Sequence, residues 1–277
     1  MNWYATYKDI ETQAAIPAGT AAISVLESFM ESASRFIDDY CHRFFYSRIE
    51  TLYHDGARGN HLLVPDLLSV TTMKADTDND GDYTDESWTE GTDFFLENCG
   101  RVTRFPKNLI RLTERGNYCF GISPRRYEIA GIWGFGDGSR AAPWDTVPAN
   151  GTLSDGADTS LTLSADVSTE IYTGSTILME SEQIFVSSYT TGTTATVVRG
   201  MNGTTATGHT GVAISKAAYP RKIVQCCKDI VVECFFNRQG IDSQYRVAAG
   251  DFVMPRNEET FYRTLRMIND YRLMAVA

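Results

Sequence analysis

An acidic run between residues 76 and 90 contains the side chains of this sequence that are best suited to metal chemistry. It begins with DTDNDGD at residues 76–82, which matches the D-x-D-x-D-G opening of a calcium-binding loop. Such a loop needs oxygen ligands at alternating positions and a glycine at its sharp turn. The sequence therefore offers a calcium site with four candidate ligands: Asp76, Asp78, Asp80 and Asp82.

The rest of the calcium-loop pattern is missing, which keeps a second interpretation open. The twelfth position is Ser87 rather than a bidentate glutamate, although Asp85 and Glu86 precede it. The flanking segments have the composition of strands rather than of the two helices of an EF-hand. Because Asp, Asn and Gly are also preferred in tight turns, the same run fits the tip of an acidic β-hairpin. Calcium is the one cofactor that the sequence suggests.

The sign of the charge reverses after this run. Residues 76–90 contain seven acids and no base, whereas residues 100–126 contain seven bases and one acid, in a chain of net charge −10. Segregated charge suits subunits that touch one another, and solvated strand faces are the alternative. For the acidic run, we favour a contact between two copies of the chain over a calcium site. In that contact the acidic hairpin of one copy meets a basic surface on its neighbour, which consists of Arg101, Arg104, Arg111, Arg125 and Arg126.

No spacing typical of a catalytic or nucleotide-binding site appears elsewhere. The histidines lack H-E-x-x-H spacing, and neither G-x-S-x-G nor G-x-x-x-x-G-K-[ST] occurs. The glycine-rich run at residues 131–138 follows a predicted strand but opens no helix, so we expect its glycines to allow close packing around Trp133 and Phe135. We expect a protein without enzymatic activity, and a hydrolase whose site assembles only in space is a minor alternative.

The composition is that of a folded, globular chain. Hydrophobic residues make up 43% and charged residues 22% of the 277 positions, which excludes wholesale disorder. No window approaches the roughly 20 apolar residues of a membrane span, and residues 1–10 lack the pattern of a signal peptide. The six cysteines are too sparse for a disulfide scaffold. We expect no membrane contact, and synthesis in a reducing cytoplasm.

Apolar spacing predicts helices near both ends of the chain and strands between them. Residues 20–45, residues 220–237 and residues 258–275 repeat apolar positions every three or four residues. Residues 46–135 instead contain short β-rich runs broken by Gly, Pro, Asp and Asn. The expected fold class is α+β, with a helical core and long antiparallel β-hairpins.

A change of composition marks an additional domain. Between residues 150 and 216, Thr, Ser, Gly and Ala dominate, and four or five short strands are separated by glycine turns. We predict an inserted small all-β domain at residues 150–216, and a discontinuous core domain made of residues 1–149 and 217–277. Asn150-Gly151 and Asn202-Gly203 are predicted to be tight turns.

The order of these segments resembles the head-tail connector (adaptor) proteins of long-tailed bacteriophages. The features that carry the resemblance are the first helix, the acidic D-x-D-x-D-G hairpin, the strand and turn RRYEIAGIWGFG, the dipeptide Val147-Pro148, the proline-led helix and the C-terminal helix. They lie in residues 20–148 and 219–277. Most of the chain is therefore covered by the likeness.

The inserted segment has a likeness of its own. It is similar to a small β-module of phage structural proteins, in which an E-x-(apolar)-x-V strand precedes an R-G-x-x-G-T-x-A-x-x-H turn. We expect Glu182 and Arg199 to pair across strands, and His209 to cap the turn by hydrogen bonding.

The resemblance implies a structural virion protein at the neck of the particle. Such a protein would form a dodecameric ring beneath the portal protein, meet a stopper or tail-completion protein, and continue a channel through which DNA passes without sequence-specific binding. It would assemble in the host cytoplasm and become part of the virion. The amphipathic C-terminal helix, together with the family's use of this segment, implies a portal contact made by Arg256, Phe261, Arg263, Leu265, Arg266, Ile268 and Arg272.

A function of another class is the alternative to the neck ring. A calcium-dependent binding module of the adhesin type, with β-rich lobes, would use the acidic run as its metal site. Glycan or metal binding would favour that alternative, whereas a ring formed with portal protein would favour the structural function.

Overall fold

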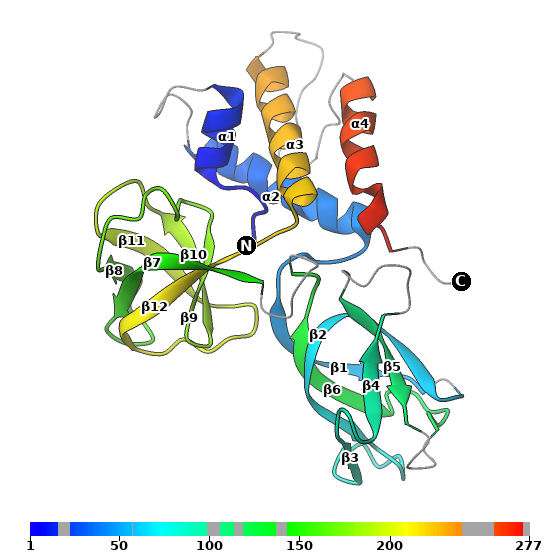
Figure 1. Cartoon of the computed structure of the whole chain (residues 1–277). Helices are drawn as coiled ribbons and strands as arrows, with labels where there is room; N and C mark the ends of the chain where they lie inside the picture. The colour runs from blue at the N-terminus through cyan, green and yellow to red at the C-terminus, as the bar shows by residue number, and fades with distance from the viewer. Residues whose placement is uncertain are drawn as a thin grey trace. The chain divides into compact units, whose positions relative to one another are not determined.

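The computed structural model describes residues 1–15, 23–56, 58–98, 106–113, 119–136, 143–239 and 258–273 (Figure 1). The chain divides into two compact units. The first, here called the barrel unit, joins Met1–His42 with Trp144–Ala277 and contains a β-barrel and the helices. The second, the sheet unit, is Arg43–Pro143.

The chain is mostly β, so the expected fold class with a helical core is wrong. Strands account for 39% of the structure and helices for 24%. Two six-stranded antiparallel sheets each enclose their own cluster of buried apolar side chains, and no residue of either cluster belongs to a helix. The helices predicted from apolar spacing near the chain ends are confirmed. The strands, however, bury their apolar side chains against other strands and not against a helical core.

The sheet unit contains one sheet with the strand order β1-β6-β2-β5-β4, in which β3 pairs with β2 off this path. The long central strand β2 pairs with β5 near its start, with β3 near its end, and with β6 along much of its length. Register shifts on either side of Leu67 mark bulges, where a strand bends. The strands are β1 (Arg48–His54), β2 (His61–Ala75), β3 (Glu86–Trp88), β4 (Phe94–Glu97), β5 (Lys107–Leu112) and β6 (Tyr127–Trp133).

The glycine-rich run at the end of β6 allows close packing. Gly131 lies so near β2 that an added Cβ would come within 2.3 Å of the Ser69 carbonyl oxygen. Gly134 has a φ of +119°, a conformation that favours glycine. Trp133 and Phe135 are each only 1% exposed. The predicted close packing around these two aromatic side chains is confirmed.

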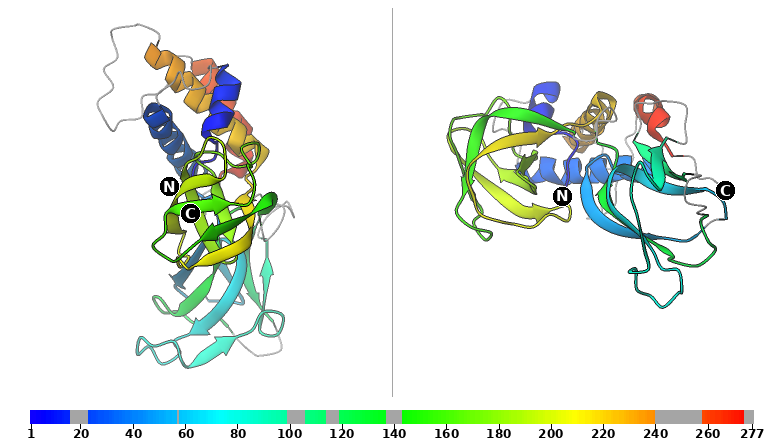
Figure 2. Two further views of the ribbon diagram at one scale, coloured as in Figure 1. Left: turned by 90° about the vertical axis from the view of Figure 1, so that its left-hand side faces the viewer. Right: turned by 60° about the horizontal axis from the view of Figure 1, so that its bottom comes forward.

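The segment predicted as an inserted β-domain lies in a closed barrel with the strand order β10-β11-β8-β7-β12-β9 (Figure 2). The predicted strands are confirmed, but the barrel also uses β7, which begins at Trp144 and pairs with both β8 and β12. The division of the chain at residues 149 and 217 stays a prediction. The strands are β7 (Trp144–Leu153), β8 (Ser160–Leu163), β9 (Thr176–Met179), β10 (Glu182–Ser188), β11 (Thr194–Met201) and β12 (His209–Ala217).

The turn predicted at Asn150-Gly151 is wrong, because both residues lie within β7. An added Cβ on Gly151 would come within 3.0 Å of three side chains of the barrel core. Glycine is therefore needed there for space in the core, and not for a turn. The turn predicted at Asn202-Gly203 is confirmed, with φ angles of +55° and +81°.

A buried charged network holds the turn between β11 and β12 against β10. The Nε and Nη2 atoms of Arg199 each lie 2.7 Å from a carboxylate oxygen of Glu182. These two side chains are 6% and 0% exposed. The Nε2 atom of His209 lies 2.8 Å from the same carboxylate, and the backbone N–H groups of Gly200 and Thr207 also donate to it. The predicted Glu182–Arg199 pair is confirmed. The ring of His209 hydrogen-bonds to the Glu182 and Glu180 carboxylates, so its predicted role as a cap of the turn stays a prediction.

Hydrogen bonds favour the ionised form of Glu182 despite its burial. Burial alone would raise the pKa of Glu182, but hydrogen bonds from Arg199, His209 and two backbone N–H groups outweigh burial and lower it to about 2. The second ring nitrogen of His209, Nδ1, lies 3.1 Å from the Glu180 carboxylate. His209 therefore bridges the carboxylates of Glu180 and Glu182.

Three of the helices were predicted. They are α2 (Ile23–Cys41), α3 (Arg221–Gln239) and α4 (Glu258–Ile268), and the last continues into a 3-10 turn, η2 (Asn269–Tyr271). The short α1 (Tyr7–Ala14) was not predicted, although its Thr6-x-x-Asp9 capping box is a recognisable start signal. Among the described residues, no helix has both the length and the apolar character needed to cross a membrane.

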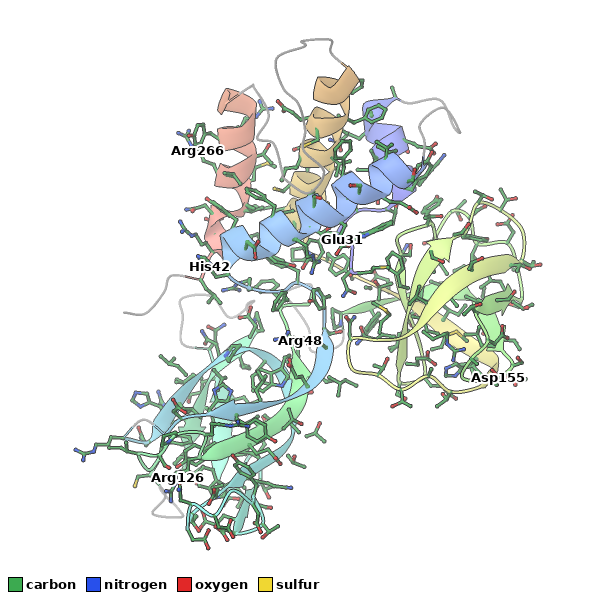
Figure 3. All side chains as sticks on the ribbon, turned by 180° about the vertical axis from the view of Figure 1, so that it is seen from behind. Glu31, His42, Arg48, Arg126, Asp155 and Arg266 are labelled. Carbon is green, nitrogen blue, oxygen red and sulfur yellow. The ribbon has the colours of Figure 1, made fainter. Side chains whose placement is uncertain are left out.

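Residues Asn2–Tyr4, here called the N-terminal strap, connect the barrel with α2. The side-chain amides of Asn2 and Asn202 donate to each other at 2.7 and 3.1 Å. The Trp3 ring packs edge-on against Phe185 of β10, with 4.9 Å between ring centroids. Its indole N–H donates to Glu31 of α2 at 2.7 Å; Glu31 is labelled in Figure 3. The strap therefore ties elements that are far apart in the sequence.

The last residue of the strap ends at a buried carboxyl group of α2. Tyr4 is 1% exposed, and its hydroxyl donates to Asp38. Burial raises the pKa of Asp38 to about 7, although Arg35, at 3.0 Å, and the Tyr4 hydroxyl both favour the charged form. The Asp38 carboxyl group is thus poised to titrate near neutral pH.

Replacing Asp38 by Asn should flatten the pH dependence of stability. The folded chain keeps a proton on Asp38 between about pH 4 and about pH 7 that the unfolded chain has lost, so stability falls as pH rises through this window. The contribution is at most about 1.4 kcal/mol per pH unit. Urea unfolding at several pH values measures it. The matched control is Asp39→Asn at the exposed neighbouring position, and equal pH profiles for both variants would contradict the assignment.

Replacing Glu182 by Gln should destabilise the barrel by about 3 kcal/mol, because it leaves the Arg199 charge buried without its partner. Glu180→Gln is the control, since that side chain also contacts His209 but is 61% exposed, and it should cost less than about 1 kcal/mol. Urea unfolding followed by circular dichroism gives both values. Similar costs for the two variants would show that the buried network does not stabilise the barrel.

Candidate functional site

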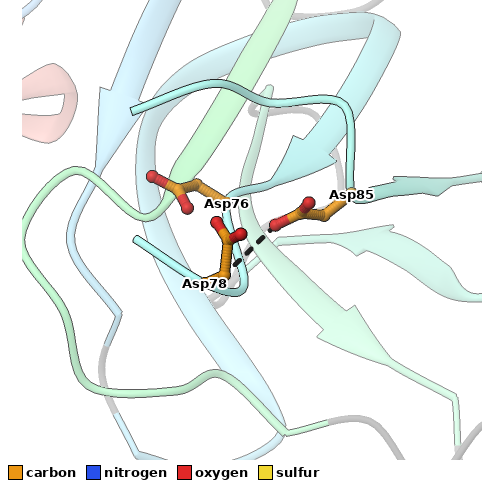
Figure 4. A group of neighbouring side chains, drawn as sticks. All are labelled: Asp76, Asp78 and Asp85. Atoms are coloured by element: carbon orange, nitrogen blue, oxygen red, sulfur yellow. Dashed lines mark hydrogen bonds between the residues drawn. The ribbon is translucent and has the colours of Figure 1, made fainter. Parts of the chain in front are cut away.

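Residues 76–85 of the acidic run lie between β2 and β3, and the rest of the run contains β3. One carboxylate oxygen each of Asp76, Asp78 and Asp85 lie within 4.8 Å of one another (Figure 4). Asp76 is buried, whereas the other two are exposed. Two of the four predicted calcium ligands thus belong to this group, here called the acidic tip. Asp85 joins them from just before the position where a calcium loop has its last ligand.

The acidic tip folds locally because its carboxylates accept hydrogen bonds from its own backbone. Asp76 accepts from two backbone N–H groups, at 2.6 and 3.0 Å. Asp85 accepts from the N–H and hydroxyl of Thr77, at 2.7 and 2.8 Å, and from the N–H of Asp78 at 3.3 Å, the bond drawn in Figure 4. The turn therefore uses these oxygens itself.

The other two predicted ligands lie outside the acidic tip. Asp80 accepts from the N–H of Asp82 at 2.8 Å, and Asp82 accepts from the N–H and hydroxyl of Thr84 at 2.9 and 2.6 Å. Each is exposed and shapes the turn that follows it. The alternation of aspartates therefore follows the needs of successive turns.

The carboxyl groups of the acidic tip have pKa shifts of opposite direction. Desolvation, and then repulsion from Asp80, Asp85 and Asp76, raise the pKa of Asp78. Hydrogen bonds from Thr77 lower the pKa of Asp85. A calcium ion would relieve the repulsion, but it needs six to eight oxygens. Most carboxylate oxygens of the acidic tip already accept hydrogen bonds from the turn. Three carboxylates fit a weak cation site better than a tight one.

The loop before β6 packs against the acidic tip of the same chain. The N–H of Asp76 donates to the Arg126 carbonyl at 3.0 Å, and the Tyr83 hydroxyl donates to the Arg125 carbonyl at 2.5 Å. The Arg126 guanidinium donates to the Thr77 carbonyl at 3.2 Å; Arg126 is labelled in Figure 3. Opposite charges that we expected to meet between copies are thus neighbours within one chain.

Strand register explains this proximity. Ala75, the last residue of β2, pairs with Tyr127, the first residue of β6, so the segments beyond them must run side by side. Of the other predicted basic residues, Arg111 pairs with Glu97 at 3.1 Å. The described residues do not include Arg101 and Arg104.

The predicted portal-contacting residues form an amphipathic helix where they are described. On α4, Arg263 and Arg266 are exposed, and Ile268 is 0% exposed. Leu265 is half-buried, and Arg272 is exposed, with its guanidinium 5.4 Å from the centroid of the Tyr40 ring. The described side chains do not include the remaining two, Arg256 and Phe261.

A groove of about 740 Å³ in the barrel unit is lined by α1, α3 and the barrel. Two of its charged side chains pair with each other, and a third caps α1. Lys216 pairs with Glu170 at 2.7 Å, and Asp9 accepts the hydrogen bonds of the Thr6 cap.

We expect no saturable calcium binding in the micromolar range, because the carboxylates of the acidic tip already serve the turn. Calorimetric titration with Ca²⁺ measures this directly. A micromolar dissociation constant that is lost in Asp85→Asn but kept in Asp80→Asn would overturn the expectation, since only Asp85 belongs to the acidic tip.

Comparisons with protein-family models, curated proteins and solved structures gave no match for this chain.

Proposed function

We propose that this protein is a structural subunit of a bacteriophage neck, which forms a ring beneath the portal protein and joins head to tail. The order of sequence motifs supports the family, and the proposal does not depend on the helical core that the structure corrects. DNA would pass through the ring without sequence-specific contacts, which agrees with the net charge of −10. A stopper or tail-completion protein would be the partner on the far side.

The observation that carries the proposal is an apolar outer face on the sheet unit. Eight large hydrophobic side chains are exposed among the described residues, and four of them lie on that face: Ile49, Tyr53, Leu63 and Phe95. They alternate with residues that pack into the core, so they cannot turn inward without unpacking the sheet. Exposed apolar surface of this kind marks protein contacts and suits an assembly subunit.

The acidic tip and the nearby arginines support a smaller role in contacts between copies than the sequence predicts. The Arg126 guanidinium of the same chain donates to the Thr77 carbonyl beside the acidic tip, and its charge helps to lower the pKa of Asp85. A contact between the acidic tip and the arginines of a neighbouring copy would therefore compete with an existing one. We assign the main adhesive role between copies to the apolar face, and the portal contact to α4.

Electron microscopy of the protein mixed with its cognate portal protein tests the proposed function. We expect rings attached to portal, with twelve copies as the stoichiometry implied by the resemblance. Protein that stays monomeric and does not bind portal protein under any condition would refute the proposed function.

Reversing two charges on α4, with Arg263→Glu and Arg266→Glu together, should weaken the portal contact about tenfold or more, equivalent to at least about 1.4 kcal/mol. Both side chains are exposed, so folding should be preserved, as circular dichroism can check. Co-sedimentation with portal gives the affinity. Arg58→Glu, at an exposed position of the sheet unit, is the control. Equal losses for the control and the α4 variant would argue against a specific role of α4.

Calcium-dependent binding of the adhesin type is the second candidate function, favoured by the grouping of Asp76, Asp78 and Asp85. It requires tight calcium binding at the acidic tip. The titration with the Asp85→Asn and Asp80→Asn variants therefore decides it as well.

A further inference from the structure

The groove in the barrel unit has positive charge on its α3 side that no described acid neutralises. Arg221 and Lys228 both line the groove from α3. Within the described ranges, neither side chain has an ion-pair partner. Lys8 lines the groove from α1, and its ammonium lies 3.7 Å from the Glu11 carboxylate. The cations of α3 are therefore available to a ligand.

The three acids that line the groove face other groups. Glu170 pairs with Lys216 at 2.7 Å. Asp9 accepts hydrogen bonds from the N–H and the hydroxyl of Thr6, at 2.9 and 2.7 Å. Asp145 lies directly opposite Lys216 in the register of β7 and β12. The acids of the groove thus lie on α1 and the barrel, and not on α3.

The acid that follows Lys228 in the sequence does not neutralise it either. The Asp229 carboxylate accepts hydrogen bonds from the side-chain amides of Gln13 and Gln225, at 2.6 and 2.7 Å. Asp229 is not part of the groove lining. The surplus charge of the groove is therefore positive, and α3 carries it.

The spacing of the two α3 cations indicates the shape of the ligand. Arg221 and Lys228 are seven residues apart, which places them on the same face of the helix and about 10 Å apart along its axis. An extended polypeptide advances about 3.3 Å per residue, so acids three positions apart in such a chain match this distance. The groove, of about 740 Å³, has the size of a ligand site. Hydroxyl groups of Thr12 and Thr169 add polar lining.

We propose that this groove binds an extended acidic segment of a partner protein, with separate carboxylates facing Arg221 and Lys228. The lining acids favour a peptide over a nucleic acid. A nucleic-acid backbone carries a charge at every unit and would bring phosphates near Asp9, Asp145 and Glu170, whereas a peptide places neutral residues there. The proposal goes beyond the neck function and does not depend on ring formation.

Fluorescence anisotropy of the full chain with a labelled peptide tests the site. The probe has glutamate at every third position with glycine and serine between, and its control has glutamine in place of glutamate. Arg221→Gln combined with Lys228→Gln should weaken binding of the acidic peptide at least about tenfold. Lys222→Gln is the matched control, because Lys222 lies on the same helix but pairs with Asp270 at 3.1 Å and does not line the groove.

The control variant and the control peptide decide whether the site is specific. An equal loss of affinity in Lys222→Gln would show a general attraction to α3 and overturn the site. Equal binding of the glutamine peptide, or no binding of the acidic peptide at low salt, would also overturn it. Circular dichroism separates a lost site from a lost fold. Because the probe is a peptide and not portal protein, its failure to bind leaves the neck proposal standing.

Two further outcomes would replace the occupant. Oligothymidylate that binds more tightly than the acidic peptide, and loses affinity in the double variant at Arg221 and Lys228, would assign the groove to nucleic acid. Self-association of the unmodified chain that is lost in the same double variant in sedimentation velocity would assign it to a second copy. Acidic-peptide binding without either result supports the proposal.

Discussion

Each of the two sheets must bury one of its faces without the help of a helix. The barrel meets this constraint by closing on itself, so that apolar side chains from all six of its strands fill the interior. The sheet unit meets it by bending at the bulges of β2 and by packing large aromatic side chains, including Trp88, Phe120 and Trp133, onto one face. Glycine is required where barrel closure or sheet packing brings backbones or side chains close together, as at Gly131 and Gly151.

The same constraint leaves apolar side chains exposed on the outer face of the sheet unit. A barrel has no edge strand, whereas the sheet unit ends in β1 and β4. Ile49 and Phe95 lie on these end strands and are about half exposed. Among the described residues, half of the exposed large apolar side chains therefore lie on the outer face of the sheet unit.

Charged side chains serve two different purposes in this protein. In the barrel, Glu182 is fully buried and is satisfied by Arg199, His209 and backbone N–H groups, so its charge contributes to the order of the turn. At the acidic tip, carboxylates are mostly exposed, and they organise successive turns of their own loop. The tip resembles a metal loop in sequence because turns and calcium loops both favour aspartate and glycine. The hydrogen bonds of the tip support its use as a turn.

The sequence by itself determined the features that depend on neighbouring residues. The periods of α2, α3 and α4, the strands β8 to β12, and the turn at Asn202-Gly203 were all predicted, because local spacing and turn chemistry decide them. The pairing of Glu182 with Arg199 was also foreseen, through the resemblance of its segment to a known β-module.

Only the tertiary structure decided which surfaces these elements bury. Apolar spacing cannot show whether a strand packs on helices or on other strands, so the helical core was wrong and β7 was not recognised as part of the barrel. Gly151 illustrates the reason, since its need for glycine comes from core side chains distant in the sequence. The meeting of Arg126 with the acidic tip likewise depends on the pairing of Ala75 with Tyr127, a contact between residues 52 positions apart, or 127 − 75. Long-range strand register is not encoded in any local pattern, and it is this register that placed the charged and apolar groups of the sheet unit.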